Sequence, residues 1–151
     1  MTLTAEAELT IAGPIESVFA QFIDYTHWAE WMPAVFRPIR GPARAIRPGD
    51  RLLMKVGGAV PSLLSVDRVE APREVCWSGG VPGLAYARHS FYFDKVSDSA
   101  TRIRSVEPWT GLLTMIKPLA DGLLKAARAG GRDQLDGFER WFQQQRSARA
   151  A

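Results

Sequence analysis

Six predicted strands in a row, followed by a long helical segment, are the feature that most constrains the fold of this chain. Apolar and polar residues alternate along most of these segments, as they do in half-buried strands. The segments are Val35–Arg40, Arg51–Val56, Ser62–Glu70, Arg73–Ser78, Leu84–Lys95 and Thr101–Trp109. Because helices flank this run of strands, an α+β fold with an antiparallel sheet is predicted.

The N-terminal part predicts one more strand and two short helices. Apolar side chains alternate with threonines and glutamates along Leu3–Ile11, which gives a seventh strand. Pro14–Ile23 has apolar residues at helical spacing and a proline at its start, where proline favours helix initiation. Asp24 can cap a second short turn, in which Trp28 and Trp31 lie on one side.

The C-terminal part predicts a long amphipathic helix. Gly111–Ala129 carries apolar residues at helical spacing, and Pro118 is tolerated only near its first turn or at a kink. We expect Gly130-Gly131 to bend or interrupt the helix before it continues through Gln134–Gln145. A twisted sheet of seven strands curls, so a single domain, residues 1–151, is predicted in which the curved sheet wraps around this helix.

Composition excludes several classes of protein and site. The chain has one cysteine, Cys76, and two histidines, His27 and His89, so an intrachain disulfide is impossible and no metal site is expected. No dinucleotide fingerprint or phosphate-binding loop is present, and no cofactor is implied. The net charge of +3 comes from scattered arginines, which we interpret as solvated faces and not as a nucleic-acid footprint.

The sequence also bears on location. No apolar run reaches about 18 residues, so no membrane span is expected. Met1–Leu9 contains two glutamates and lacks the pattern of a secretory signal. Together with the single cysteine, this favours a cytoplasmic protein. A homodimer is possible, and the sequence does not determine the oligomeric state.

Alternation along the two longest strands predicts which side chains point inward. On the first, Ala85, Ala87, His89, Phe91 and Phe93 share the less charged face. On the second, the corresponding set is Thr101, Ile103, Ser105, Glu107 and Trp109. If these strands form a hairpin, His89 lies opposite or diagonal to Ser105 and Glu107. The glycine-rich segment Gly79–Gly83 is expected to be a loop.

This polar trio has two interpretations. In the first, Glu107 simply satisfies His89 in a buried polar pair, because buried polar groups are normally hydrogen-bonded. Alternatively, His89 orients a ligand or acts as a general acid or base held by Glu107, which makes both residues catalytic candidates. A nucleophilic role for Ser105 is not expected, because no nucleophile elbow or oxyanion-hole loop is recognisable.

Several short motifs, taken in order, resemble the START-like superfamily, also called Bet v 1-like or helix-grip. Within it the chain is most similar to the polyketide cyclase/dehydrase and lipid-transport group. The motifs are Gly13–Phe19, Asp24 with Trp28 and Trp31–Pro33, Arg47–Asp50, Cys76–Gly80, His89–Phe93, Thr101–Ile103, and Glu107 with Gly111. They identify a fold and not an activity, because members of one fold family can differ in function.

The resemblance implies a deep cavity between the curved sheet and the C-terminal helix. We therefore expect a small hydrophobic ligand, aromatic or lipid-like, to bind there. The candidate ligand-binding residues are Met54, Trp77, His89, Phe91, Ile103, Ser105, Glu107, Trp109, Met115 and Leu119. The many aromatic residues of the chain are expected to contribute a ligand-facing wall.

Two other functions remain open at this point. In the first, the chain is an enzyme of the cyclase or dehydratase kind, and His89 with Glu107 moves protons on a polyketide-like substrate. In the second, the arginine-rich C-terminal helix is a protein-interaction module, which would show a broad exposed apolar patch on that helix.

Overall fold

The structure is a computed structural model that describes residues 2–151, so Met1 of the predicted domain lies outside the described residues. The elements follow in the order β1 (Leu3–Ala12), α1 (Ile15–Phe22), η1 (Tyr25–His27), α2 (Trp28–Trp31), β2 (Phe36–Arg40), β3 (Arg51–Val56), β4 (Val60–Glu70), β5 (Glu74–Val81), β6 (Ala85–Ser97), β7 (Ala100–Thr110), η2 (Leu112–Met115) and α3 (Lys117–Ala150). The predicted α+β fold is confirmed.

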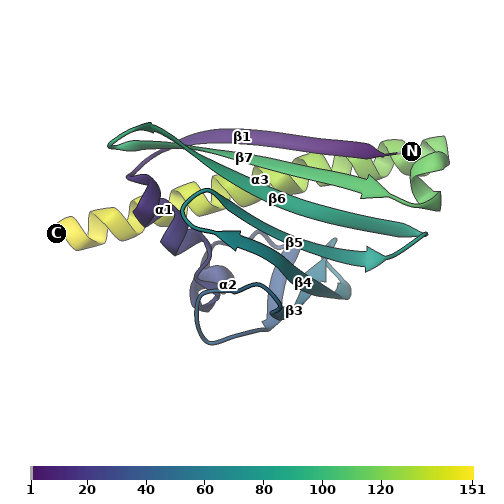
Figure 1. The fold of residues 1–151 in the computed structure, drawn as a ribbon, viewed down its shortest axis with the longest axis horizontal. Coiled ribbons are helices and arrows are strands. Elements are labelled where there is room, and N and C mark those ends of the chain that lie inside the picture. The colour runs from purple at the N-terminus through teal and green to yellow at the C-terminus, as the bar shows by residue number, and fades with distance from the viewer. Residues whose placement is uncertain (1) are drawn as a thin grey trace.

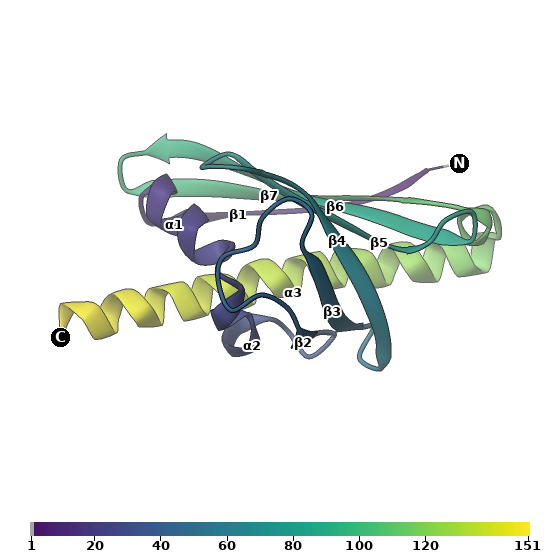
Figure 2. The same cartoon turned by 60° about the horizontal axis from the view of Figure 1, so that its bottom comes forward.

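The seven strands form one antiparallel sheet in the order β1-β7-β6-β5-β4-β3-β2. The sheet curves strongly, and α3 runs along its inner side (Figures 1 and 2). The short helices α1 and α2 lie between β1 and β2 in the chain and close the same side of the sheet towards the C-terminal half of α3. This is the helix-grip arrangement that the sequence predicts.

The short helices form where the sequence predicts them. Pro14 precedes α1, Glu16 lies in its first turn, and the apolar stripe of α1 is buried. The Asp24 side chain then caps η1 by accepting a hydrogen bond of 3.1 Å from the backbone N–H of Thr26. The buried ring of Trp28 follows, and its indole N–H donates to the carbonyl of Phe22 at 2.9 Å. These contacts fix α1 and α2 against each other.

The expectation of a bend at Gly130-Gly131 is wrong, because α3 is one helix of 34 residues. These glycines serve packing. A Cβ on Gly130 would lie 2.8 Å from the Phe36 ring, and one on Gly131 would lie 3.1 Å from the Ser105 hydroxyl oxygen. The missing side chains therefore let α3 approach the sheet closely. None of the helices in residues 2–151 has the length and apolar composition that a membrane crossing requires.

Two of the differences between predicted and observed boundaries bear on the site. Residues 112–115 form the separate turn η2, and α3 begins only at Lys117, with Pro118 in its first turn. Strand β5 continues to Val81, so Gly79 and Gly80 belong to the sheet and not to a loop. Gly80 has a φ of +108°, and a side chain there would clash with the carbonyl oxygen of Ala85.

The predicted alternation along β6 and β7 is confirmed. The inward sets of both strands are buried, except that Ala85 and Trp109, near their ends, are half-buried. Most aromatic side chains, however, pack on one another and not around an open space. The ring of Phe22, for example, contacts five other aromatic rings, those of Trp31, Trp77, Phe91, Phe93 and Phe138. A ligand-facing aromatic wall is thus limited to Phe36, Trp77 and Trp109, while the rings around Phe22 form core.

Candidate functional site

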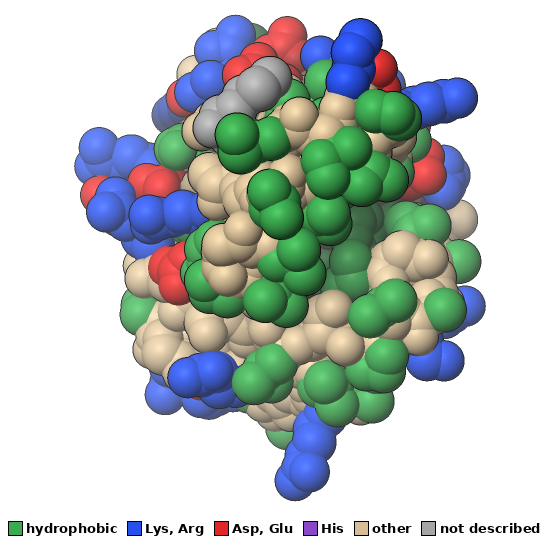
Figure 3. Space-filling model, turned by 90° about the vertical axis from the view of Figure 1, so that its right-hand side faces the viewer, with side chains coloured by type: hydrophobic (Ala, Val, Ile, Leu, Met, Phe, Trp, Pro, Cys, Tyr) green, Lys and Arg blue, Asp and Glu red, His purple; other side chains and the backbone are tan. Residues whose placement is uncertain are grey.

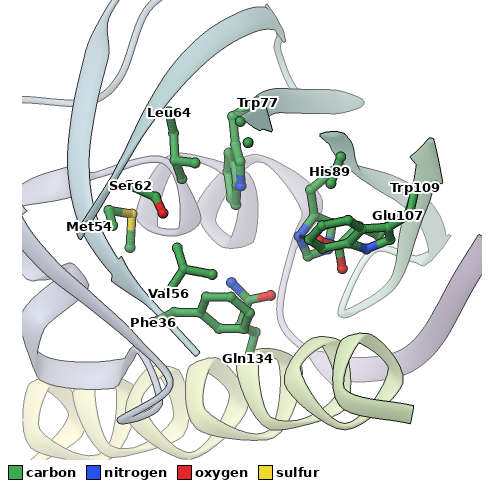
Figure 4. Close-up of a pocket in the computed structure, with 13 residues that line it drawn as sticks. Phe36, Met54, Val56, Ser62, Leu64, Trp77, His89, Glu107, Trp109 and Gln134 are labelled. Atoms are coloured by element: carbon green, nitrogen blue, oxygen red, sulfur yellow. Dashed lines mark ion pairs between the residues drawn. The ribbon is translucent and has the colours of Figure 1, made fainter. Parts of the chain in front are cut away.

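A cavity of about 90 Å³ lies between the inner face of the sheet and α3. Its wall is mostly apolar and comes from β2 to β7 and from one residue of α3. The lining residues are Phe36, Met54, Val56, Ser62, Leu64, Trp77, Gly79, Gly80, Ala87, His89, Glu107, Trp109 and Gln134. Figure 4 shows His89, Glu107 and Trp109 together on one side, Met54 and Leu64 on the other, and Gln134 rising from α3 between them.

A larger hollow of about 280 Å³ adjoins this cavity. Phe36, Val56, Glu107 and Trp109 line both spaces, so they form the boundary between them. The hollow extends along α3 from Leu123 to Asp133 and past Gly57 at the β3–β4 turn. Ligand pockets typically start at about 300 Å³. A bound molecule of that size would therefore occupy the hollow as well as the inner cavity.

The polar part of the cavity is built by β6 and β7. Their register pairs Phe91 with Ser105 and Ala87 with Trp109, which brings His89 level with Glu107. A hydrogen bond of 2.7 Å joins Nε2 of His89 to Oγ of Ser105. On the other side of the ring, Nδ1 lies 3.9 Å from Oε1 of Glu107. Both residues that the sequence places near His89 therefore lie beside its ring, but only Ser105 is within hydrogen-bond distance.

Burial changes the protonation of this pair. The side chains of His89 and Glu107 are only 5% and 9% exposed. Loss of water disfavours the charged form of each group. Burial therefore lowers the pKa of His89 to about 3. It also raises the pKa of Glu107 to about 7, against a smaller opposing effect of the Trp109 indole.

These pKa directions assign different chemistry to the two groups. Near neutral pH His89 is an uncharged ring, which can hydrogen-bond but does not hold a proton ready for transfer. Glu107 exchanges its proton in the physiological range and can either accept or donate a hydrogen bond. Of the two catalytic candidates, Glu107 is thus the one whose protonation state is suited to acid or base chemistry.

Ser105 is held away from the cavity. Its hydroxyl is occupied by His89, its side chain is buried, and α3 covers it at Gly131. It is not among the residues that line the cavity. Ser105 therefore positions the imidazole ring and is not placed to attack a bound molecule.

Gln134 is a polar cavity residue that the strand-based reasoning misses. It lies on the buried stripe of α3, one residue before Leu135 and four before Phe138, and is 2% exposed. Its Nε2 donates to the sulfur of Met32 at 3.5 Å, while its Oε1 has no partner. The signal available in the sequence is a glutamine on an otherwise apolar helical stripe.

Eight of the ten candidate residues named from the sequence lie in the cavity wall or directly beside it. Met54, Trp77, His89, Glu107 and Trp109 line the cavity. Phe91 and Ile103 are fully buried in the adjoining core, and Ser105 supports His89 from behind.

Met115 and Leu119 are not part of the cavity, and their assignment as cavity residues is a mistake. They are 67% and 49% exposed. The physical reason is that η2 replaces the expected first helical turns, so that helical spacing counted from Gly111 does not predict which residues face the sheet.

The part of the chain that the structure describes contains no group of three or more His, Cys, Asp or Glu side chains arranged to hold a metal ion. His27 is not among the residues that line the cavity. Its ring is half-exposed and its Nδ1 lies 2.9 Å from Glu30 on the surface of α2.

Comparison with solved structures shows the same fold in several proteins. Hypothetical protein jhp0584 from Helicobacter pylori matches with a TM-score of 0.74 and 18% identity, over 92% of this chain and 87% of that one. The di-domain ARO/CYC StfQ from the steffimycin biosynthetic pathway matches with a TM-score of 0.74 and 13% identity, over 97% of this chain and 52% of that one. DynU16, from the dynemicin biosynthetic locus, matches with a TM-score of 0.66 and 14% identity, over 93% of this chain and 47% of that one.

A comparison with curated proteins found no match. A family model described as polyketide cyclase / dehydrase and lipid transport matches residues 2–142, which is nearly the whole chain. The helix-grip fold, with its cavity between the sheet and the long helix, agrees with that match. The chain therefore belongs to the polyketide cyclase/dehydrase and lipid-transport family.

Proposed function

We propose that the chain binds a small, largely apolar molecule, aromatic or lipid-like, whose polar end faces Glu107 and Gln134. The observation that carries this proposal is an apolar cavity whose lining includes polar groups from both the sheet and α3, among them Glu107 and the unpartnered Oε1 of Gln134. Gln134 comes from α3 and Glu107 from β7, so a molecule between them would contact both the helix and the sheet.

The unpartnered oxygen of Gln134 favours a ligand that donates a hydrogen bond. A buried acceptor without a partner costs about 1–3 kcal/mol, and a donor on the ligand would recover part of that cost. An ionised Glu107 would accept from the same kind of donor, while a protonated Glu107 would donate to a ligand carbonyl. A hydroxyl group attached to an apolar ring meets these requirements.

A matched pair of probes tests the proposal. 1-Naphthol and 1-methylnaphthalene have nearly the same shape, and only the first donates a hydrogen bond. We expect 1-naphthol to bind about threefold to tenfold more tightly, the net effect of one hydrogen bond. Competition for a fluorescent apolar probe or calorimetry would measure the two affinities.

Two variants sharpen this test. Gln134→Leu should reduce the preference for the hydroxyl while retaining binding of the hydrocarbon. Gln144→Leu, at an exposed position of the same helix, is the matched control and should retain the preference. If neither probe binds, or if Gln134→Leu keeps the full preference, the proposal is wrong.

A second candidate function is catalysis of the cyclase or dehydratase kind. It is favoured by one observation, namely that burial raises the pKa of Glu107 to about 7, where a carboxyl group can both take and return a proton. In this account His89 and Ser105 position Glu107 and the substrate. A poly-β-ketone thioester, followed by mass spectrometry, should then lose water or cyclise with the wild type and not with Glu107→Gln. An unchanged thioester would leave binding as the function.

A further inference from the structure

The end of the molecule at which β5 joins β6 and α3 begins exposes an unusual amount of apolar surface. Six large apolar side chains there are between 43% and 67% exposed. We call them the end patch: Val81, Leu84, Leu112, Met115, Ile116 and Leu119. Figure 3 shows apolar side chains gathered over this end of the molecule, around a recess in the surface.

The end patch is one continuous surface, because backbone hydrogen bonds join its two segments. The N–H of Leu112 donates to the carbonyl of Gly83 at 2.9 Å, and the N–H of Leu113 donates to the carbonyl of Leu84 at 3.0 Å. These hydrogen bonds hold the β5–β6 turn and the η2 turn side by side. Isolated exposed apolar residues are ordinary, but a contiguous patch on one end marks an interaction surface.

Charge distinguishes among the partners that could cover this patch. Residues 79–86 and 108–116 contain no charged side chain. Directly after them, α3 carries three cations, Lys117, Lys125 and Arg128, and only one carboxylate, Asp121, up to residue 129. Lys117 and Asp121 form an exposed pair at 2.9 Å, so the remaining charge of this stretch is positive.

We propose that the end patch docks on the surface of a lipid bilayer that contains anionic headgroups. Protruding aliphatic side chains flanked by cations are what such an interface binds, through apolar insertion and attraction to the headgroups. A second copy of this chain fits less well. A symmetric contact through the patch would bring this positive stretch of α3 to the interface twice and would add no negative charge to balance it.

The position of the patch connects it with the cavity. Leu119 lies one helical turn before Leu123, which lines the outer hollow, and Trp109, which lines both hollow and cavity, lies just before η2. A molecule that leaves the cavity through the hollow would emerge beside the patch. Docking itself does not depend on whether the cavity is filled, so it can be tested apart from ligand binding.

Co-sedimentation with vesicles tests the proposal. The full chain is mixed with vesicles of phosphatidylcholine, or of phosphatidylcholine and phosphatidylserine, and the bound fraction is measured at low and high salt. We expect clear binding to the mixed vesicles that weakens with salt. The double variant Met115→Glu, Leu119→Glu should lower the partition coefficient by about tenfold or more, since it replaces exposed apolar groups by charges.

The matched control is Val96→Glu. Val96 is 57% exposed, like the patch residues, but lies at the opposite end of β6 from Leu84. This variant should bind as the wild type does, while Lys125→Glu should weaken binding only to the mixed vesicles. Thermal melts check that each variant is folded, which is expected because every changed side chain is exposed.

Three results would overturn the proposal. The first is a wild type that stays in the supernatant with both kinds of vesicle. The second is a Met115→Glu, Leu119→Glu variant that binds as well as the wild type. The third is a dimer, seen by light scattering and dissociated by this double variant, with no vesicle binding; the patch is then a contact between copies of the chain.

Discussion

Replacing Glu107 by glutamine should stabilise the folded chain at alkaline pH. Glutamine has nearly the same shape as a protonated glutamate and stays neutral at every pH. The wild-type carboxyl, in contrast, must ionise inside a cavity where its side chain is only 9% exposed. The variant therefore removes the cost of a buried negative charge and leaves the packing of β7 unchanged.

The magnitude follows from the pKa of the carboxyl in the two states. Burial raises the pKa of Glu107 from its ordinary value of 4.5 to about 7 in the folded chain. Between these values the folded state holds a proton that the unfolded state has released, so stability falls as pH rises. One pH unit corresponds to about 1.4 kcal/mol, and the whole interval to about 3 kcal/mol.

The assay is urea unfolding followed by tryptophan fluorescence, near pH 5 and near pH 8. Glu107→Gln and the wild type should have similar stabilities at the lower pH, whereas the variant should be more stable by about 3 kcal/mol at the higher pH. Glu6→Gln, at an exposed position of β1, is the control and should show no such change. A difference between wild type and Glu107→Gln that is equal at both pH values would refute the reasoning.

Further predictions concern the packing of α3 and the support of the histidine. Gly137→Ala should destabilise the chain by about 1–3 kcal/mol, because the added Cβ would lie 2.5 Å from the carbonyl oxygen of Trp31. Gly122→Ala, at an open position of the same helix, should stabilise the chain by about 0.5–1 kcal/mol. Urea unfolding that ranks the two variants the other way would contradict this prediction. Ser105→Ala should cost about 1–3 kcal/mol, because it leaves Nε2 of His89 without its partner, and an unchanged unfolding midpoint would show that the bond adds no stability. His89→Phe should reduce the loss of stability on acidification between about pH 6.5 and 3. Burial lowers the pKa of His89 to about 3 in the folded chain, so in this interval the unfolded ring binds a proton that the folded ring does not. An acid unfolding curve with the wild-type slope would argue against this.

Local patterns in the sequence are sufficient for the sheet and for part of the site. Side chains alternate along a strand by backbone geometry alone, so the inward positions of His89 and Glu107 follow from their strands without knowledge of the rest of the fold. Their mutual approach needs only the pairing of β6 with β7. Trp77 and Met54 are identified in the same way, from the alternation within β5 and β3.

Features that depend on contacts between distant segments are not predicted. Gly130 and Gly131 resemble helix breakers in the sequence, but their role is to let α3 approach Phe36 and Ser105. Gln134 becomes a cavity residue only because α3 remains one helix through these glycines. Met115 fits a helical stripe when spacing is counted from Gly111, but the extended residue before α3 changes the phase of the helix.

Volume is the other property that the sequence does not determine. The same composition of aromatic residues can enclose a large space or fill it. Here Phe22 gathers five rings around itself, so the inner cavity is about 90 Å³ and a bound molecule must extend into the hollow along α3. That division of the interior results from how α1 packs between the sheet and α3.

The most direct test of ligand binding in this cavity is an NMR titration of the tryptophan indole N–H signals with 1-naphthol. Trp77 and Trp109 line the cavity, whereas Trp141 does not: it is buried farther along α3, where its indole N–H donates to Glu30 at 2.7 Å. The signals of Trp77 and Trp109 should shift in a saturable manner while that of Trp141 stays unchanged. If the two cavity signals do not move, or if only Trp141 responds, the cavity is not the binding site.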